Sequence, residues 1–278
     1  MTEPGVRLSV VIPAYNEGSY LDASLTSLRQ QDFTGSYEVI VVDNNSADDT
    51  AAIASAHGAR VLHEPRRGVC VARERGTRAA RGEIVVSTDP DTVHPADWLT
   101  RLDAQFQRND GAIAVAGPCR YADPPWWAAI FPRLWFAAVS LCSTRLGRVF
   151  YLTATNLAFV RSRFPGYDTT LTQGGDELDL LRRLQARGKI IWDPANPVFT
   201  SSRRMNQGLP HTLVVSFGYH YAGSYLVNRL TSRTVLGAAP AIRGHDAEEV
   251  GRRRRRWRAG AAMGTVMIAA LVQAASGR

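Results

Sequence analysis

The sequence predicts an α/β fold with a mostly parallel central sheet flanked by helices. Short apolar runs bounded by turn residues alternate with segments of helical periodicity, and this alternation is typical of βαβ units. Polar residues directly follow several of the apolar runs. In a parallel sheet, the residues at the carboxyl ends of the strands form the ligand-binding edge. The sequence contains neither of the glycine-rich dinucleotide and P-loop patterns, so we do not expect a classical nucleotide-binding fold of either kind.

Each expected element has a local reason. Leu8–Ile12 is an apolar run stopped by Pro13, which predicts a buried strand. Similar runs predict strands at Glu38–Val42, Ala59–Leu62, Glu83–Ser87 and Ala112–Ala116. Helical spacing of apolar residues, or a helix-favouring composition, predicts helices at Glu17–Gln31, Asp48–His57, Val69–Ala80, Pro95–Gln107 and Asp176–Arg187.

Composition excludes several classes of protein. The chain is 45% hydrophobic and 21% charged, which excludes a disordered or fibrous protein. The three cysteines form no C-x-x-C pair, so we expect neither a disulfide framework nor a structural zinc site, and a reducing compartment fits. The N-terminal residues lack the pattern of a signal peptide, and we therefore expect a cytoplasmic location.

The net charge of +8 is concentrated at the C-terminal end. Residues 241–278 carry eight arginines and three acidic residues, so we expect no nucleic-acid partner for the main body. Arg252–Arg258 precedes an apolar stretch, Ala259–Ser276. This pattern fits a basic helical extension at an anionic membrane surface, peripheral at the inner face of the plasma membrane. A membrane span and a packed C-terminal helix with solvated arginines are the alternatives.

The segment Pro124–Leu146 is rich in aromatic and apolar residues. Three interpretations stay open for Trp126–Leu146: a lip that binds the acceptor, a helix at a membrane surface, or an ordinary core helix.

Asp89-Pro90-Asp91 follows one of the expected strands. Two carboxylates separated by one residue can share a divalent cation, which in turn suits phosphate oxygens. The alternative is a solvated turn that also caps the following helix.

The chain resembles the family 2 glycosyltransferases over roughly Leu8 to Arg204. Six segments match that family in its order. They are Val10–Glu17 (VVIPAYNE), Val41–Thr50 (VVDNNSADDT), Arg67–Gly76, Asp89–Asp91, Thr155–Phe159 (TNLAF) and Gly175–Leu180 (GDELDL).

The resemblance implies a GT-A fold and an inverting, metal-dependent transfer from a nucleotide-diphosphate sugar, with UDP or GDP as the nucleotide. It implies a glycosyltransferase domain over residues 1–205, with a nucleotide-binding half at about 1–117 and an acceptor half at about 118–205. Residues 206–278 form the extension. The acceptor is expected to be a glycan or a lipid-linked molecule of the cell envelope.

The resemblance also assigns the donor-binding residues. Pro13 and Tyr15 lie against the nucleobase, Asp43 recognises that base, and Glu17 and Arg73 line the donor side.

The resemblance further implies that Asp89 faces the ribose and the metal and that Asp91 coordinates Mg²⁺ or Mn²⁺. Such a cation neutralises the charge that grows on the leaving diphosphate.

The catalytic base is assigned to the first turn of the last expected helix. The family's usual Gly-Glu-Asp-x-Asp-Leu here has its two acids exchanged, which puts Glu177 at the position of the catalytic aspartate. Asp176 is the rival for that role, and Asp179 is expected to be structural. Helix-dipole stabilisation is the alternative role for the two acids at the helix start.

One position departs from the family. Many relatives carry a histidine after the penultimate strand, whereas this chain has Val198–Arg204 (VFTSSRR). Metal binding then depends on Asp91, diphosphate and water, and Arg203 or Arg204 contacts the diphosphate. A nucleotidyltransferase, and a non-catalytic membrane-surface module on the same fold, are the competing functions.

Overall fold

The computed structural model describes residues 5–171, 176–203 and 205. The chain divides into two compact units, residues 1–239 and 240–278. Residues 206–278, which contain the expected basic extension and its apolar stretch, lie outside the described residues.

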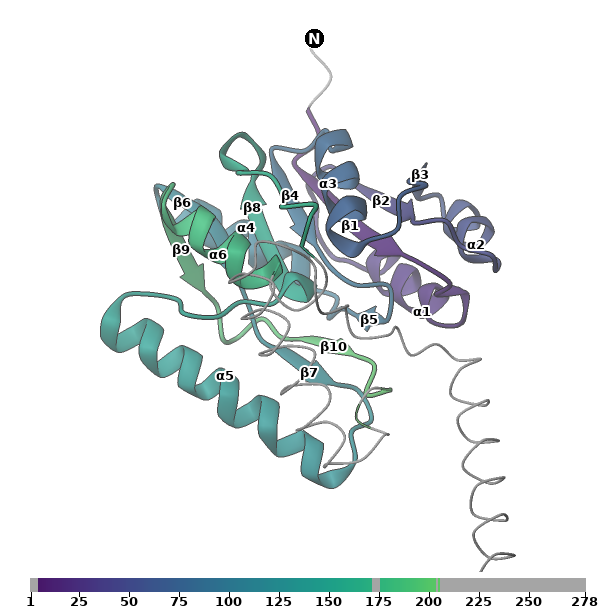
Figure 1. Ribbon diagram of the computed structural model, residues 1–278. Coiled ribbons are helices and arrows are strands. Elements are labelled where there is room, and N and C mark those ends of the chain that lie inside the picture. The colour runs from purple at the N-terminus through teal and green to yellow at the C-terminus, as the bar shows by residue number, and fades with distance from the viewer. Residues whose placement is uncertain (1–4, 172–175, 204, 206–278) are drawn as a thin grey trace, which may run out of the picture. The chain divides into compact units, whose positions relative to one another are not determined.

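A seven-stranded sheet forms the centre of the described residues, in the order β3-β2-β1-β4-β8-β6-β9 (Figure 1). The first four strands in that order are parallel, β8 runs antiparallel to both of its neighbours, and β9 is parallel to β6. The bounds are β1 (Leu8–Ala14), β2 (Tyr37–Asp43), β3 (Arg60–His63), β4 (Ile84–Ser87), β6 (Ala112–Ala116), β8 (Leu157–Val160) and β9 (Lys189–Trp192).

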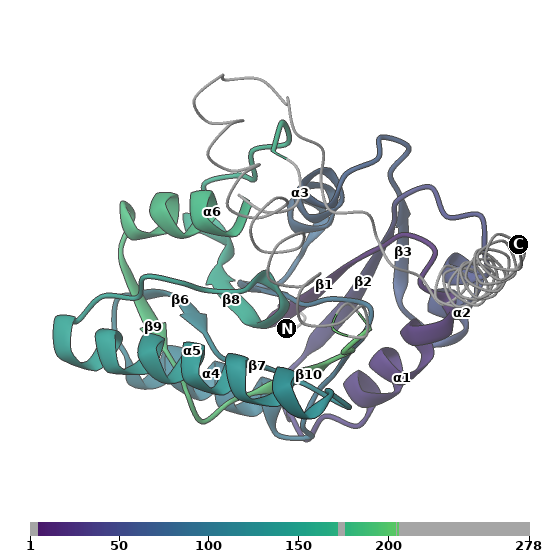
Figure 2. The ribbon, with the colours of Figure 1, turned by 60° about the horizontal axis from the view of Figure 1, so that its bottom comes forward.

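Helices cover both faces of this sheet (Figures 1 and 2). The helices are α1 (Gly18–Arg29), α2 (Thr50–Ala56), α3 (Val69–Ala79), α4 (Trp98–Arg108), α5 (Trp126–Leu146) and α6 (Asp176–Gln185). Alternate residues of each strand point to opposite faces, so Val10 packs with α1, α2 and α4 while Val11 packs with α3, α5 and α6. The apolar strand runs are therefore buried on both sides.

Gly76 brings α3 close to the sheet. A Cβ atom at this position would lie 2.4 Å from Val11 and 2.9 Å from Val42, so a larger residue would push the helix away from β1 and β2. Because α3 carries Arg73, this close packing also sets where that guanidinium lies.

A second, small sheet has the order β5-β10-β7. It is made of β5 (Thr92–Val93), β7 (Cys119–Tyr121) and β10 (Val198–Thr200). The antiparallel pairing of β10 with β5 brings the chain around residue 200 back to the segment that follows Asp91. Helix α5 lies beside β7 in both views (Figures 1 and 2).

The predicted fold class is confirmed, with a mostly parallel sheet flanked by helices. All five expected strands and the expected helices form, each within a few residues of the expected bounds, and Trp126–Leu146 forms one helix. The sequence analysis missed β5, β7, β8, β9 and β10, and it missed the antiparallel direction of β8. Cys70, Cys119 and Cys142 form no disulfide bond. Among the described residues, no helix is both long and apolar enough to span a membrane.

Candidate active site

Asp89 is held at the carboxyl end of β4 by two side chains. The Arg73 Nη2 donates to Asp89 Oδ1 at 2.8 Å, and the Thr155 hydroxyl donates to Asp89 Oδ2 at 2.5 Å. Arg73 comes from α3 and is buried, while Thr155 lies in the short 3₁₀ turn Ala154–Asn156 before β8. The structure therefore brings the predicted residues Asp89 and Arg73 together.

Glu177 joins the same group through Thr153. The Glu177 Oε1 accepts hydrogen bonds from the Ala154 backbone N–H at 2.8 Å and from the Thr153 hydroxyl at 3.1 Å. The Thr153 hydroxyl also lies 3.1 Å from the Thr155 hydroxyl. A continuous chain of polar contacts thus links Glu177, Thr153, Thr155 and Asp89. Asp176 is the first residue of α6, and its side chain lies outside the described atoms.

Asp91 is held by the small sheet and by an arginine. Its Oδ1 accepts from the Thr200 hydroxyl at 3.1 Å, and its Oδ2 lies 3.1 Å from Arg203 Nη2. The same guanidinium donates to both carboxylate oxygens of Glu17, at 2.8 Å each, and stacks 4.6 Å from the ring centre of Tyr20. Arg203 therefore binds Glu17 and Asp91 at once. Arg204 lies outside the described residues.

The pKa shifts show that these carboxylates act on one another. Burial raises the pKa of Glu17, the hydrogen bond to Arg203 opposes that rise, and the charges of Asp91 and Asp89 add to it. Burial would lower the pKa of Arg203, but its hydrogen bond to Glu17 and the charges of Asp91 and Glu17 outweigh burial and raise it.

The Cys119 thiol, on β7, lies within the electrostatic reach of Asp89, Asp91 and Glu177. Burial raises its pKa, and the charges of Asp89, Asp91 and Glu177 raise it further. Four carboxylates (Glu17, Asp89, Asp91 and Glu177) and two guanidiniums (Arg73 and Arg203) therefore share one region, which carries an excess of negative charge.

The donor set fits a hard divalent cation that shares its coordination with phosphate. Carboxylate oxygens are the ligands that Mg²⁺ and Mn²⁺ prefer. A bound cation would also neutralise the excess negative charge of this region. Among the described residues, no three acidic, histidine or cysteine side chains form a ready metal cluster. The oxygens of Asp91 are engaged by Thr200 and Arg203, so a bound cation would compete with the guanidinium for Asp91.

The predicted base-recognition residues lie at the ends of β1 and β2. Asp43 Oδ1 accepts from the Ser46 backbone N–H at 3.1 Å, and its Oδ2 lies 3.4 Å from His63 Nδ1. Pro13 is buried within β1, while Tyr15 is half-buried just after it. The structure therefore places all three predicted base-side residues at the carboxyl edge of neighbouring strands.

Asn44 and Arg67 are functional candidates that the sequence analysis did not assign. The Asn44 amide donates to the carbonyls of Glu64 and Arg66, and its oxygen accepts from the Gly68 N–H at 2.8 Å. These three hydrogen bonds shape the loop that carries Arg67. The Arg67 guanidinium lies 4.0 Å from the centre of the Tyr15 ring. The Arg67-Gly68-Val69 match was the only sequence signal for this contact.

Thr153, Thr155 and Thr200 were also missed as partners of the acids. A threonine carries no charge and no spacing pattern, so nothing in the sequence connects it to a carboxylate far away in the chain.

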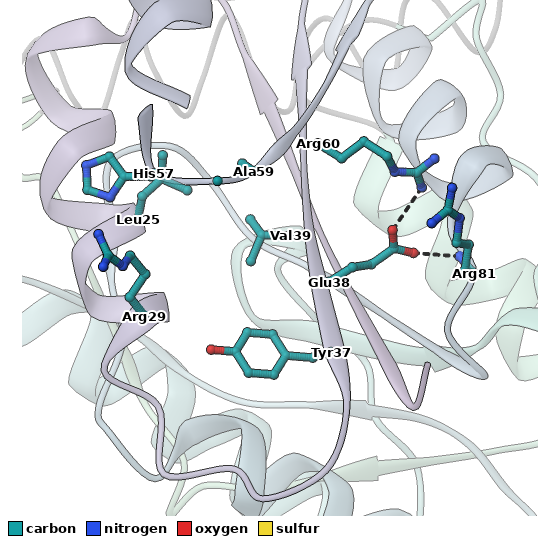
Figure 3. Close-up of a pocket in the computed structure, with 10 residues that line it drawn as sticks. Leu25, Arg29, Tyr37, Glu38, Val39, His57, Ala59, Arg60 and Arg81 are labelled. Atoms are coloured by element: carbon teal, nitrogen blue, oxygen red, sulfur yellow. Dashed lines mark hydrogen bonds and ion pairs between the residues drawn. The ribbon is translucent and has the colours of Figure 1, made fainter. Parts of the chain in front are cut away.

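A pocket of about 430 Å³ lies away from these residues, at the amino-terminal ends of β2 and β3. Figure 3 shows Glu38 joined to Arg60 and Arg81 on one side of this pocket and Leu25, Arg29 and His57 on the other. None of the predicted site residues lines it. Glu38 forms an ion pair with Arg60 at 3.0 Å and accepts a hydrogen bond from the Arg81 backbone N–H at 2.7 Å.

Comparison with known proteins identifies the family of the chain. The family described as "Glycosyl transferase family 2" matches residues 9–158, more than half of the chain. The chain belongs to the family 2 glycosyltransferases. The match contains Glu17, Arg73, Asp89 and Asp91, and it ends before Glu177 and Arg203.

Individual relatives cover only part of the chain. An uncharacterised glycosyltransferase of Mycobacterium tuberculosis is 38% identical over 129 residues, which is 45% of this chain and 56% of that protein. The chain therefore matches little more than half of that relative's length.

Two solved structures share the fold. The mannosyltransferase PcManGT of Pyrobaculum calidifontis, in complex with GDP-Man and Mn²⁺, is 20% identical with a TM-score of 0.58, covering 98% of this chain and 87% of its own. Glucosyl-3-phosphoglycerate synthase of M. tuberculosis, in complex with Mn²⁺, UDP and glucosyl-3-phosphoglycerate, is 22% identical with a TM-score of 0.57, covering 84% of this chain and 82% of its own.

Proposed function

We propose that the protein transfers a sugar from a nucleotide-diphosphate sugar to an acceptor hydroxyl with inversion at the anomeric carbon. The observation that carries this proposal is the pair of linked acid groups at the carboxyl edge of the sheet. One group is the polar chain from Glu177 to Asp89, and the other is the Glu17–Arg203–Asp91 triad. Together they supply a base for the acceptor and carboxylates that can hold a cation for the diphosphate.

The donor is a UDP- or GDP-sugar. PcManGT binds GDP-Man and the synthase binds UDP, which supports both nucleotides for this fold. On this chain, Tyr15 and Arg67 offer a stacking surface for a base, and Asp43 offers a carboxylate that accepts from base N–H groups.

Asp91, aided by Asp89, would hold Mg²⁺ or Mn²⁺, as the Mn²⁺ complexes of both structural neighbours support. When bound, the cation supplies positive charge to the leaving diphosphate. Arg203 is permanently charged, so once it is displaced from Asp91 it can still contact a phosphate oxygen.

Glu177 removes the proton of the acceptor hydroxyl. A direct displacement that inverts the anomeric carbon needs one base, since the hydroxyl loses its proton as it attacks. The hydrogen bonds from Ala154 and Thr153 fix Glu177 Oε1 in place, so the carboxylate does not have to be ordered during the reaction. Asp176 remains the rival base.

The acceptor is proposed to be a glycan or a lipid-linked molecule of the cell envelope, bound by the half that begins near residue 118. We propose that the protein works in the cytoplasm at the inner face of the plasma membrane, with its basic residues 206–278 toward anionic lipid. Both proposals rest on the sequence and its resemblance.

Thermal unfolding with UDP or GDP, each with and without Mn²⁺, tests the function most simply. We expect one nucleotide to raise the melting temperature only when Mn²⁺ is present, because a ligand that binds the folded state stabilises it. The same nucleotide's sugars are then tested for metal-dependent hydrolysis and transfer. A protein that responds to neither nucleotide would be a non-catalytic module, and release of pyrophosphate from a sugar phosphate and a nucleoside triphosphate would indicate a nucleotidyltransferase.

A further inference from the structure

The exposed large hydrophobic residues gather on one helix. Among the described residues, seven large hydrophobic side chains are exposed, and six of them lie on α5 or just after it. These six are Ile130, Leu134, Trp135, Leu141, Leu146 and Phe150. Single exposed apolar residues are ordinary, but a contiguous group on one element marks an interaction surface.

The inner side of α5 is already packed. Val139 is buried in the core, Phe136 stacks on Trp192 with ring centres 5.7 Å apart, and the Trp192 indole N–H donates to the Ser140 hydroxyl at 2.8 Å. These contacts fix the helix on the folded unit. Its opposite side is therefore a preformed, stable surface.

Helical geometry aligns three of these exposed hydrophobic residues and the exposed Ala137 into a stripe, whereas Trp135 and Leu146 lie on the other side of the helix. Ile130, Leu134, Ala137 and Leu141 recur at i, i+4, i+7 and i+11, which confines them to about 60° of the helix circumference at 3.6 residues per turn. The 21 residues of α5 extend for about 31 Å. We refer to these four residues as the α5 stripe.

Arginines border the stripe. Arg133 and Arg145 are exposed, and the helical wheel puts one on each side of it, about 60° from Ile130. No acidic residue occurs between Asp123 and Asp168, whereas this interval contains five arginines. The face is thus apolar along its centre and positive along both edges.

We infer that the α5 stripe docks on an anionic lipid surface, with its apolar side chains among the acyl chains and its arginines at the phosphate level. Long arginine side chains can lie along apolar surface and still present the guanidinium to headgroups. A helix that is apolar on one side and basic at the borders lies in the plane of the membrane interface.

Charge favours anionic lipid over two other occupants of the α5 stripe, a second copy of the chain and the chain's own residues 206–278. In a symmetric dimer the same face meets itself, which would bring the arginines of both copies together without an acid to pair them. The chain's own residues 206–278 contain ten arginines and three acidic residues, so they too are positive and are poorly matched to this face. Anionic lipid supplies the complementary charge.

The test measures flotation of the full chain with vesicles of equal parts phosphatidylcholine and phosphatidylglycerol, and with phosphatidylcholine alone. We expect binding to the mixed vesicles that falls as salt is raised. Replacing Leu134 and Leu141, which are 67% and 57% exposed, with serine should weaken it about tenfold or more without lowering the melting temperature. Arg133→Gln with Arg145→Gln should weaken it by about fivefold per arginine.

Arg29→Gln with Arg108→Gln is the matched control. Both arginines are exposed in the last turns of α1 and α4, so the change in charge is equal but lies off the stripe. This control should keep the parent's binding, and all variants should keep the parent's response to nucleotide.

Three results would overturn the inference. They are absence of vesicle binding by the parent, parent-level binding by the double leucine variant, and conversion of a dimeric parent to a monomer by that variant in sedimentation. A double leucine variant that melts at lower temperature, from a parent that binds no vesicles, would instead show that the chain itself covers the stripe.

Discussion

Removing the Arg203 guanidinium tests the charge balance of the site. Arg203 joins Glu17 and Asp91 while its own side chain is only 14% exposed, and the Glu17 side chain is 8% exposed. Arg203→Gln therefore leaves two largely buried carboxylates facing each other without their cation. Breaking a buried pair in this way costs about 3–5 kcal/mol, and we expect a value near the lower end because water reaches part of the site.

The loss of this ion pair should first lower the melting temperature of the protein without ligands. For a chain of this size, about 3 kcal/mol corresponds to a fall of about 6–12 °C in melting temperature. Arg182→Gln is the matched control, because Arg182 pairs with Asp179 at 3.1 Å but is 58% exposed. An exposed pair contributes about 0–1 kcal/mol, so this control should shift the melting temperature by no more than about 4 °C.

Added Mn²⁺ then separates a structural role from a role at the metal position. Arg203 occupies one oxygen of Asp91, so its loss should make Asp91 more available to a cation. We expect Arg203→Gln to bind Mn²⁺ without nucleotide about tenfold more tightly than the parent does, measured by calorimetry, and to recover part of its lost melting temperature. Its turnover should nevertheless fall, because a positive group near the diphosphate is missing. Equal Mn²⁺ affinity in variant and parent, with an unchanged melting temperature, would refute this reasoning.

Three further outcomes follow from the site and its supports. Asp91→Asn should abolish transfer and weaken Mn²⁺-dependent binding of nucleotide diphosphate, with the fold kept by circular dichroism; unchanged turnover would remove Asp91 from the metal site. Asp43→Ala should raise the donor KM, because a charged hydrogen bond contributes about 1.5–3 kcal/mol to binding; equal donor affinity would leave Asp43 a structural role through Ser46 and His63. Burial lowers the pKa of His94 from 6.5 to about 3, so the unfolded chain takes up a proton first. The free energy of unfolding should keep its full value above pH 6.5 and be about 2 kcal/mol lower at pH 5. In His94→Gln, this decrease between pH 6.5 and pH 5 should be largely absent from the denaturation profile.

The fold of the first half was predictable because its signals are local. β1, β2 and β4 are apolar runs with turn residues at their ends, and each packs on helices that show their own periodicity. Two of the strands that were missed are very short, as β5 has two residues and β7 has three. Their sequences contain too few residues for a period, and pairing with β10 defines them.

The site was predictable only where the family supplies a motif. Asp89 and Arg73 were assigned from matching segments, and the structure brings them together. The bond between Glu17 and Arg203 joins residues 186 positions apart, and no local pattern indicates it. The sequence analysis expected Arg203 or Arg204 at the diphosphate, and in the structure the Arg203 side chain binds the carboxylates of Glu17 and Asp91. A guanidinium forms strong, charge-assisted hydrogen bonds with carboxylates, and no local sequence pattern indicates that two of them lie beside it.

The assignment of Glu177 as the base is the central claim, and comparing kcat with donor affinity in Glu177→Gln tests it most directly. A base acts only as the acceptor proton leaves, so we predict a fall in kcat of about 10²–10⁴-fold with donor affinity nearly unchanged. Glu177→Asp should recover part of the activity, and Asp176→Asn should have a smaller effect. A Glu177→Gln enzyme that turns over at the parent rate, together with an inactive Asp176→Asn, would contradict the account and assign the base to Asp176.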